Sequence, residues 1–254
     1  MTGYIPKIVF ITGATGDFGR AFARRFAGVG SALILHGRSQ EKLDALAEEF
    51  PYVRAHTLCF DVTDQAAIAE AIDSIPEAFG AIDLLINNAG GALGQSPADE
   101  STLDDWLKMI EINNSALVAV THPVLQGMSV RRRGHIINIG STAGNYPYPG
   151  GHVYCAVKAF VKQFSLALRA DTYSKNIRVT NIEPGMVKTQ FSLVRYKGDQ
   201  KAADAVYANT TPLTADDVAE SVFWAASQPS HVNINRIELM PTRQAPGPLA
   251  VDRD

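Results

Sequence analysis

The sequence IVFITGATGDFG, residues 8–19, joins an apolar run to the start of an amphipathic segment. The apolar run has the length and β-branched content of a buried strand, and FGRAFARRFAGVG (18–30) has the apolar spacing of a helix. Between them lies TGATGDFG (12–19), which we call the glycine turn. Glycines at such a turn let the backbone approach a pyrophosphate, and the helix N-terminus supplies N–H donors. The stretch predicts a strand–turn–helix unit that binds a nucleotide.

The same alternation continues along the chain. Further apolar runs lie at 32–35, 56–60, 83–88, 135–141, 177–184 and 236–240, and further helical patterns at 40–50, 101–128 and 154–173. Strands that alternate with helices predict a parallel sheet covered on both faces. We therefore expect an α/β fold with a doubly wound, Rossmann-type sheet of about seven strands in a single domain, residues 1–254. Its ligand crevice should lie beyond the carboxyl ends of the strands.

Two segments read as additions to this pattern. Residues 190–215, the cover segment, fall between a strand end and the last helix, where they could cover a ligand. The tail at 241–254 has no helical or strand period and is predicted to be irregular. The tail either has no fixed conformation or lies across a neighbouring subunit. The second arrangement would bring Arg243 to that subunit's site.

Composition excludes several classes of function. A net charge of −3 on 254 residues gives no reason to expect a nucleic acid partner. The two cysteines, Cys59 and Cys155, do not make a disulfide framework, and the six histidines lack metal-ligand spacing, so we expect no metal. No apolar run has the length needed to cross a bilayer, and the start lacks the pattern of a signal peptide. A cytoplasmic protein is expected.

The end of the second predicted strand indicates the type of dinucleotide. Enzymes that bind NAD usually carry a carboxylate there, whereas an arginine suits the 2′-phosphate of NADP. Here the strand ends in ALILHGRSQ, and no carboxylate appears until Glu41. Arg38 offers a guanidinium, Ser39 a hydroxyl, and His36 can flank them. These residues favour NADP(H) as the cofactor.

A reactive group is predicted around Tyr154. Tyr154 and Lys158 stand four residues apart on a predicted helix, so both project from one face, and Ser141 precedes the tyrosine by thirteen residues. A cation ~4 Å from a phenol, at an effective dielectric of ~20, contributes about 4 kcal/mol, or roughly 3 pK units. Lys158 should thus lower the pKa of Tyr154 toward neutrality and make it a general acid or base. Ser141 can donate to a carbonyl oxygen.

Together these motifs resemble the short-chain dehydrogenase/reductase family in its compact NADP-dependent form. The resemblance runs from residue 7 to about residue 240 and also includes DV (61–62), NNAG (87–90), Asn113 in EINNSA and PG (184–185). Within the family, the chain looks most like NADP-dependent 3-hydroxy acid (serine-type) dehydrogenases, with sulfoacetaldehyde reductases as a sister branch. GHIINIGSTAG (134–144), SLVRYKGD (192–199) and HVNINRIELMP (231–241) carry that likeness.

The resemblance implies a set of site residues. The catalytic residues would be Asn113, Ser141, Tyr154 and Lys158, with Asn113 holding a water beside the lysine and Asn114 as the alternative to Asn113. From the residues themselves, we expect Ser141, Tyr148, Tyr154 and Arg195 to bind the substrate, because the Arg195 guanidinium in the cover segment can pair with an acidic group and Tyr148 stands six residues before Tyr154. Cofactor contacts would come from Gly13, Thr15, Asp17, Phe18, Gly19, Arg38, Ser39, Asp61, Val62, Asn88, Ala89, Gly90, Tyr154, Lys158, Pro184, Gly185, Val187 and Thr189.

Asp17 is a departure from the family pattern. It stands where Thr-Gly-x-x-x-Gly-x-Gly has its middle glycine. Because a carboxylate would repel a pyrophosphate, we expect Asp17 to turn away or to cap the helix.

The expected function is the NADPH-dependent reduction of a small aldehyde or ketone that carries an acidic group. Sulfoacetaldehyde to isethionate and malonic semialdehyde to 3-hydroxypropionate are the examples that the resemblance implies. The alternatives are a general carbonyl or oxoacyl reductase with an open apolar pocket, and a non-catalytic NADP-binding sensor. The resemblance also implies a homodimer or homotetramer formed through the helices at 101–128 and 154–173.

Overall fold

Seven strands form one parallel sheet in the computed structural model, which describes residues 4–247 and 251. The strands are β1 (Ile8–Ile11), β2 (Ala32–Gly37), β3 (Ala55–Cys59), β4 (Leu84–Asn87), β5 (Gly134–Ile139), β6 (Ile177–Pro184) and β7 (Arg236–Leu239). Their order is β3-β2-β1-β4-β5-β6-β7, so the chain winds outward in one direction from β1 and then in the other from β4. The predicted doubly wound sheet is confirmed, and each strand lies within two residues of its predicted bounds.

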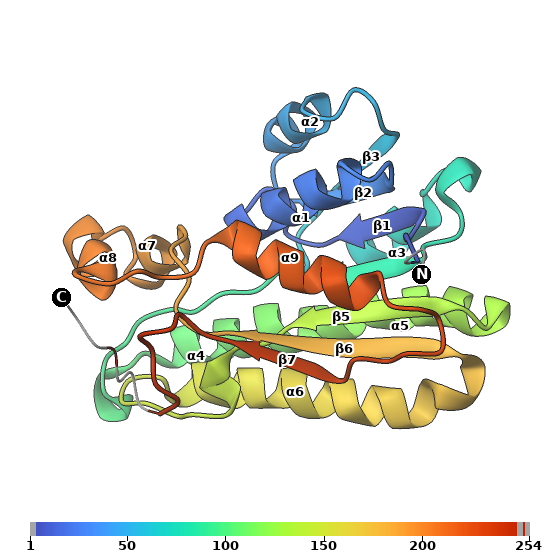
Figure 1. Cartoon of the computed structure of the whole chain (residues 1–254). Helices are drawn as coiled ribbons and strands as arrows, with labels where there is room; N and C mark the ends of the chain where they lie inside the picture. The colour runs from blue at the N-terminus through green and yellow to red at the C-terminus, as the bar shows by residue number, and fades with distance from the viewer. Residues whose placement is uncertain (1–3, 248–250, 252–254) are drawn as a thin grey trace.

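Helices cover both faces of this sheet (Figure 1). Val9 and Ile11 of β1 pack in the core layer of α1 (Asp17–Ala27), α2 (Gln40–Glu48) and α9 (Ala215–Ala226). Ile8 and Phe10 point to the opposite layer, which contains residues of α3 (Gln65–Asp73), α5 (Ala116–Arg131) and α6 (His152–Thr172). Because both faces are covered, the central strands are fully buried, and their residues are mostly apolar, with Asn87, His135 and Asn138 as buried polar exceptions. The edge strand β7 instead alternates between exposed and half-buried residues.

The predicted helix at 101–128 is a continuous helical stretch with a change of geometry in its middle. α4 (Leu103–Ile110) leads into a π-helical segment, η3 (Glu111–Ser115), and α5 follows without a break. A π segment holds one extra residue in a turn, which a regular apolar period does not reveal.

The cover segment is also more ordered than its composition suggests. It contains the short helices α7 (Phe191–Arg195) and α8 (Gln200–Tyr207). Beyond β7, the described tail residues form only an isolated bridge between Gln244 and Val251. The rest of the predicted tail, 248–250 and 252–254, lies outside the described residues.

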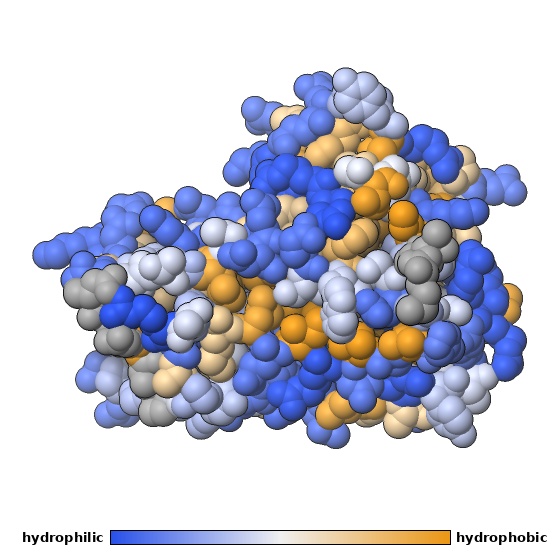
Figure 2. Space-filling view, in the orientation of Figure 1, coloured by the Kyte–Doolittle hydropathy of each residue, from blue (hydrophilic) through white to orange (hydrophobic). Residues whose placement is uncertain are grey.

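Several surface features bear on possible partners. Hydrophobic residues gather on the face between α9 and β7 (Figure 2). Of the residues in these two elements, Trp224 is exposed and Ile237 is half-buried. Within residues 4–247, no helix is both long and apolar enough to span a bilayer. The same part of the chain contains no group of three His, Cys, Asp or Glu side chains that could hold a metal ion.

Candidate active site

A cavity of about 770 Å³ lies beyond the carboxyl ends of the strands. Every strand of the sheet contributes residues from its end or from the loop that follows it. In Figure 1 this is the side to which the strand arrows point, and α7, α8 and the described tail lie there. The residues at or after the strand ends are Gly13, Gly37, Arg38, Asp61, Val62, Asn88, Ala89, Gly90, Gly91, Gly140, Ser141, Pro184, Gly185 and Met240.

The glycine turn forms one wall of the cavity. Gly13 has φ +63°, and a Cβ there would lie 3.1 Å from the Asn88 side chain. A Cβ on Gly19 would lie only 2.3 Å from the carbonyl oxygen of Gly13, so α1 approaches the turn as closely as glycine permits. Gly16 provides no side-chain cap for α1. The N-terminus of α1 therefore faces a cavity that Thr15 and Phe18 also line, which fits a pyrophosphate.

Asp17 does not cap α1, contrary to one of the two expectations. It is the first residue of the helix, and its Oδ2 accepts a hydrogen bond from the backbone N–H of Gln190 at 2.6 Å. The carboxylate is thus engaged by the cover segment, although Asp17 still lines the cavity.

The end of β2 offers a cationic group to the cavity. Arg38 is exposed and lines the cavity, whereas Ser39 does not line it and instead caps α2 by accepting from the backbone N–H of Lys42. Asp61 accepts hydrogen bonds from the backbone and the hydroxyl of Thr63, and the backbone bond is the main cause that lowers the pKa of Asp61. Lys108 lines the same region. The cationic groups of Arg38 and Lys108 fit a ribose that carries a 2′-phosphate better than a ribose with two free hydroxyls.

Tyr154 and Lys158 project from α6 into the cavity. Both are buried, and the Lys158 ammonium lies 5.8 Å from the centre of the Tyr154 ring. Lys158 donates through Nζ to the carbonyl oxygen of Ile139, at 3.0 Å, at the end of β5. Ser141, two residues further along, also lines the cavity.

The predicted lowering of the Tyr154 pKa is wrong for this arrangement. Burial raises the pKa of Tyr154 above its ordinary value, and the charge of Tyr148 adds to this, while hydrogen bonding with Ser141 and the charge of Arg195 lower it. Burial also lowers the pKa of Lys158 to about 8. The prediction failed because it counted a cation at ~4 Å and omitted the desolvation of the phenol.

Asn113 lies in the π segment η3. Its Nδ2 donates to the carbonyl oxygens of Gly91 and Met109, both at 2.8 Å, and its Oδ1 accepts from the backbone N–H of Gly91. Asn114 instead donates to the carbonyl oxygen of Val157 within α6. A Cβ on Gly90 would meet Asn113 Oδ1 at 2.7 Å and Lys158 Nζ at 3.9 Å. Asn113 does not line the cavity, but it lies directly behind the residues that do.

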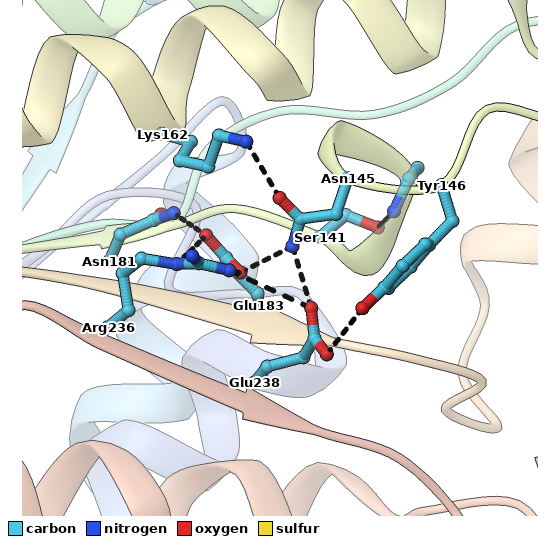
Figure 3. Close-up of polar contacts among 9 residues, drawn as sticks. Ser141, Asn145, Tyr146, Lys162, Asn181, Glu183, Arg236 and Glu238 are labelled. Carbon is cyan, nitrogen blue, oxygen red and sulfur yellow. Dashed lines mark hydrogen bonds and ion pairs between the residues drawn. The ribbon is translucent and has the colours of Figure 1, made fainter. Parts of the chain in front are cut away.

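The turn that carries Ser141 is anchored at its other end. This turn, residues 141–145, begins at Ser141 and ends at Asn145, whose Nδ2 donates to the carboxylates of Glu183 and Glu238, each at 2.7 Å (Figure 3). The Oδ1 of Asn145 accepts from Lys162 at 2.8 Å. Arg236 pairs with Glu183 at 2.6 Å. This serine-turn network fixes the turn against α6, β6 and β7.

Arg195 reaches the cavity from the end of α7. It is 8% exposed, donates through Nε to the carbonyl oxygen of Gly94, and donates through Nη1 to the Tyr148 hydroxyl at 2.8 Å. Its guanidinium carbon lies 5.7 Å from the centre of the Tyr154 ring. The remaining nitrogen, Nη2, is buried and has no hydrogen-bond partner among the described residues. A buried guanidinium with an unused donor fits an anionic ligand.

Several cavity residues escaped the sequence argument. Gln244, from the described tail, lines the cavity and accepts through Oε1 from the backbone N–H of Met186. The described tail therefore reaches this chain's own cavity, which Arg243 does not line. Gly91 and Met186 adjoin predicted positions and could have been found by extending those motifs. Gln244 lies within an irregular tail, and the sequence gave no signal for its position.

Comparison with known proteins gives consistent results. The family described as short chain dehydrogenase matches residues 7–199. Sulfoacetaldehyde reductase 2 of Chromohalobacter salexigens is 54% identical over 252 residues, which cover 98% of this chain and 100% of that protein. NADP-dependent 3-hydroxy acid dehydrogenase YdfG of Salmonella typhi is 51% identical over 97% of this chain and 99% of its own. The structure described as the closed form of serine dehydrogenase complexed with NADP+ is 50% identical, covers 97% of this chain and 100% of its own, and has a TM-score of 0.91.

Proposed function

The chain belongs to the short-chain dehydrogenase family, and from that premise we propose that it reduces a small aldehyde or ketone bearing a carboxylate or sulfonate, with NADPH as the reductant. Sulfoacetaldehyde, which would give isethionate, and malonic semialdehyde, which would give 3-hydroxypropionate, are the two substrates we favour. The relatives named as a sulfoacetaldehyde reductase and as a 3-hydroxy acid dehydrogenase support this choice of chemistry.

NADP(H) is the proposed cofactor because of the residues at its expected site. The glycine turn would hold the pyrophosphate and Arg38 the 2′-phosphate, since β2 ends in Gly37 and Arg38 rather than in a carboxylate. A relative of similar sequence is described as NADP-dependent, and a similar structure as complexed with NADP+. When bound, NADPH supplies the hydride.

Tyr154 is the proposed proton donor. Its raised pKa keeps the phenol protonated at neutral pH, so it can deliver a proton to the carbonyl oxygen as that oxygen gains negative charge. Ser141 would donate a hydrogen bond to the same oxygen. Lys158, with a pKa of about 8, remains mostly charged at neutral pH and would stabilise the phenolate left after transfer. Asn113 would hold the loop of Gly90 and Gly91 beside the lysine.

The proposed substrate class rests on one observation, the buried and unpaired Nη2 donor of Arg195. The guanidinium of a buried arginine normally has partners for its donors, whereas the buried Nη2 of Arg195 has none among residues 4–247. The Tyr148 hydroxyl beside Nη1 would add a second polar contact to the anion. Since Arg195 also lies over the Tyr154 ring, an acidic group bound there would place a nearby carbonyl at the phenol.

Oxidation of NADPH with sulfoacetaldehyde, malonic semialdehyde and propanal in parallel tests this function. We expect both acidic substrates to exceed propanal in kcat/KM by about 10- to 100-fold, the range that hydrogen bonds to a charged group supply. Equal values for propanal would favour a general carbonyl reductase, and no oxidation with any substrate would favour a sensor. Arg195→Ala should raise KM for the acidic substrates while kcat with propanal changes little; an unchanged KM would contradict the assignment.

We also propose that the chain forms a homodimer or homotetramer. Apart from Val130 at the end of α5, six large apolar side chains on α4, α5 and α6 are at least 36% exposed, and exposed apolar surface of this kind supports association between copies. Light scattering coupled to size exclusion tests this, and a monomeric mass would contradict it. The side chains are Leu103, Leu107, Ile110, Val118, Phe160 and Leu166.

A further inference from the structure

Asp17 links two parts of the cavity that are far apart in the sequence. We propose that Asp17 is a positioning residue that holds α7, and with it Arg195, over the substrate. The inference rests on the proposed function, because it assigns Arg195 to the acidic group. It gives a role to the carboxylate that stands where the related glycine pattern has its middle glycine.

The contact itself is specific. Oδ2 of Asp17 accepts from the backbone N–H of Gln190 at 2.6 Å, and Gln190 is the residue that immediately precedes α7. N–H groups at the start of a helix have no partner within the helix, so an external acceptor satisfies one of them. A bond from an N–H to a carboxylate is about twice as strong as one between neutral groups.

This bond lies close enough to Arg195 to affect the position of its guanidinium. α7 has five residues and Arg195 is its last, so the whole helix spans only about 7.5 Å. The other end of α7 is held separately, since the carbonyl oxygen of Arg195 accepts from the backbone N–H of Gly94, and Lys197 pairs with Asp105 at 2.8 Å. Asp17 anchors the first end to α1. With both ends held, the guanidinium has a fixed place over Tyr154.

The position also has a cost, since Asp17 lines the part of the cavity assigned to the pyrophosphate. A negative charge there opposes cofactor binding. The effect of Asp17 on the cofactor and its effect on Arg195 should therefore have opposite signs. Asp17→Asn separates them, because it keeps an oxygen acceptor for Gln190 and removes the charge.

The experiment compares Asp17→Gly, Asp17→Asn and wild type with sulfoacetaldehyde and with propanal at saturating NADPH. We expect Asp17→Gly to raise KM for sulfoacetaldehyde about tenfold, the value of one charged hydrogen bond, and by at least about fivefold more than KM for propanal. The KM of Asp17→Asn for sulfoacetaldehyde should lie between those of Asp17→Gly and wild type. The Kd of NADPH should stay the same or decrease in both variants. Equal KM changes for the two substrates, or none for sulfoacetaldehyde, would overturn the inference.

Limited trypsin digestion gives a readout that needs no substrate. Lys197 and Lys201 are exposed in the cover segment, and cleavage after them should be at least about threefold faster in Asp17→Gly, because the freed end of α7 opens more often. Asp216→Gly is the matched control, since it removes an exposed acid from the first turn of α9. Equal cleavage in wild type and Asp17→Gly would also overturn the inference. A wild type that does not prefer acidic substrates would instead overturn the proposed function, while the digestion would still test the hold on α7.

Discussion

His36 accepts a hydrogen bond through Nδ1 from the backbone N–H of Gly13, with 3.2 Å between the two nitrogens. Because Nδ1 is the acceptor, the ring proton lies on Nε2, which donates to the carbonyl oxygen of Phe60 at 3.1 Å. The imidazole is buried, and burial lowers its pKa to about 4. A neutral histidine thus ties the glycine turn to the ends of β2 and β3.

This arrangement predicts a loss of stability in acid. The folded pKa of about 4 lies below the ordinary value of 6.5, so the folded state favours the neutral ring. Its contribution is complete above pH 6.5 and is lost as the pH falls toward 4, up to about 3 kcal/mol. We expect His36→Asn, which keeps an acceptor near Gly13, to lose less unfolding free energy over that range. Urea unfolding at several pH values measures the unfolding free energies of wild type and His36→Asn. Parallel pH curves for the two proteins would contradict the prediction.

Tyr154→Phe should abolish turnover and leave the cofactor site intact. Loss of the proton donor should reduce kcat by about 10²–10⁴-fold, the usual contribution of general acid catalysis. The Kd of NADPH, measured by its fluorescence, should change less than about threefold, because the aromatic ring and its packing remain. Tyr173→Phe removes the same hydroxyl from an exposed ring and serves as the control. Substantial activity in a folded Tyr154→Phe variant would remove Tyr154 from its proposed role.

The raised pKa of Tyr154 predicts that the two reaction directions respond differently to pH. Reduction needs the protonated phenol, which burial favours, so its kcat should vary little between about pH 6 and 8. Oxidation of the hydroxy acid needs the phenolate, whose fraction rises about tenfold per pH unit below the pKa. Initial rates in both directions across this range provide the test. A reduction rate that falls steeply from pH 6 upward would show that the phenol ionises near neutrality.

Asn145→Asp should damage the serine turn by charge alone. The substitution keeps the shape of the side chain but places a third carboxylate between Glu183 and Glu238, where Asn145 now donates to both. We expect kcat at about pH 8 to fall at least about tenfold and to recover partly toward pH 6, as one carboxylate of the cluster is protonated. Asn145→Ala should lose activity without that recovery. The same pH profile in both variants would contradict a positioning role for this cluster.

The sequence revealed the parts of the molecule that depend on local patterns. Buried strands read as apolar runs, and the glycine turn is recognisable because Gly13 and Gly19 meet at a backbone contact that any side chain would prevent. Tyr154 and Lys158 were placed together because four residues on a helix fix their relative direction. In each case the relevant neighbours lie close in sequence.

What the sequence did not reveal depends on contacts between distant segments. The bond from Gln190 to Asp17 joins residues separated by 173 positions, and the bond from Met186 to Gln244 joins a loop to an irregular tail. The Tyr154 pKa was misjudged for a similar reason, since burial of the phenol is a property of the packed site. Neither a propensity nor a spacing along the chain contains this information.

The π segment that holds Asn113 has a consequence for protein engineering. Its five residues accommodate one more residue than a regular helix would in the same length. Deleting a single residue from 111–115 would let ordinary α-helical bonds close over the same length, so α4 and α5 would keep nearly the same relative orientation. The widened turn that presents Asn113 to Gly91 would be lost, so such a deletion should leave the helix intact and remove the Asn113 contacts.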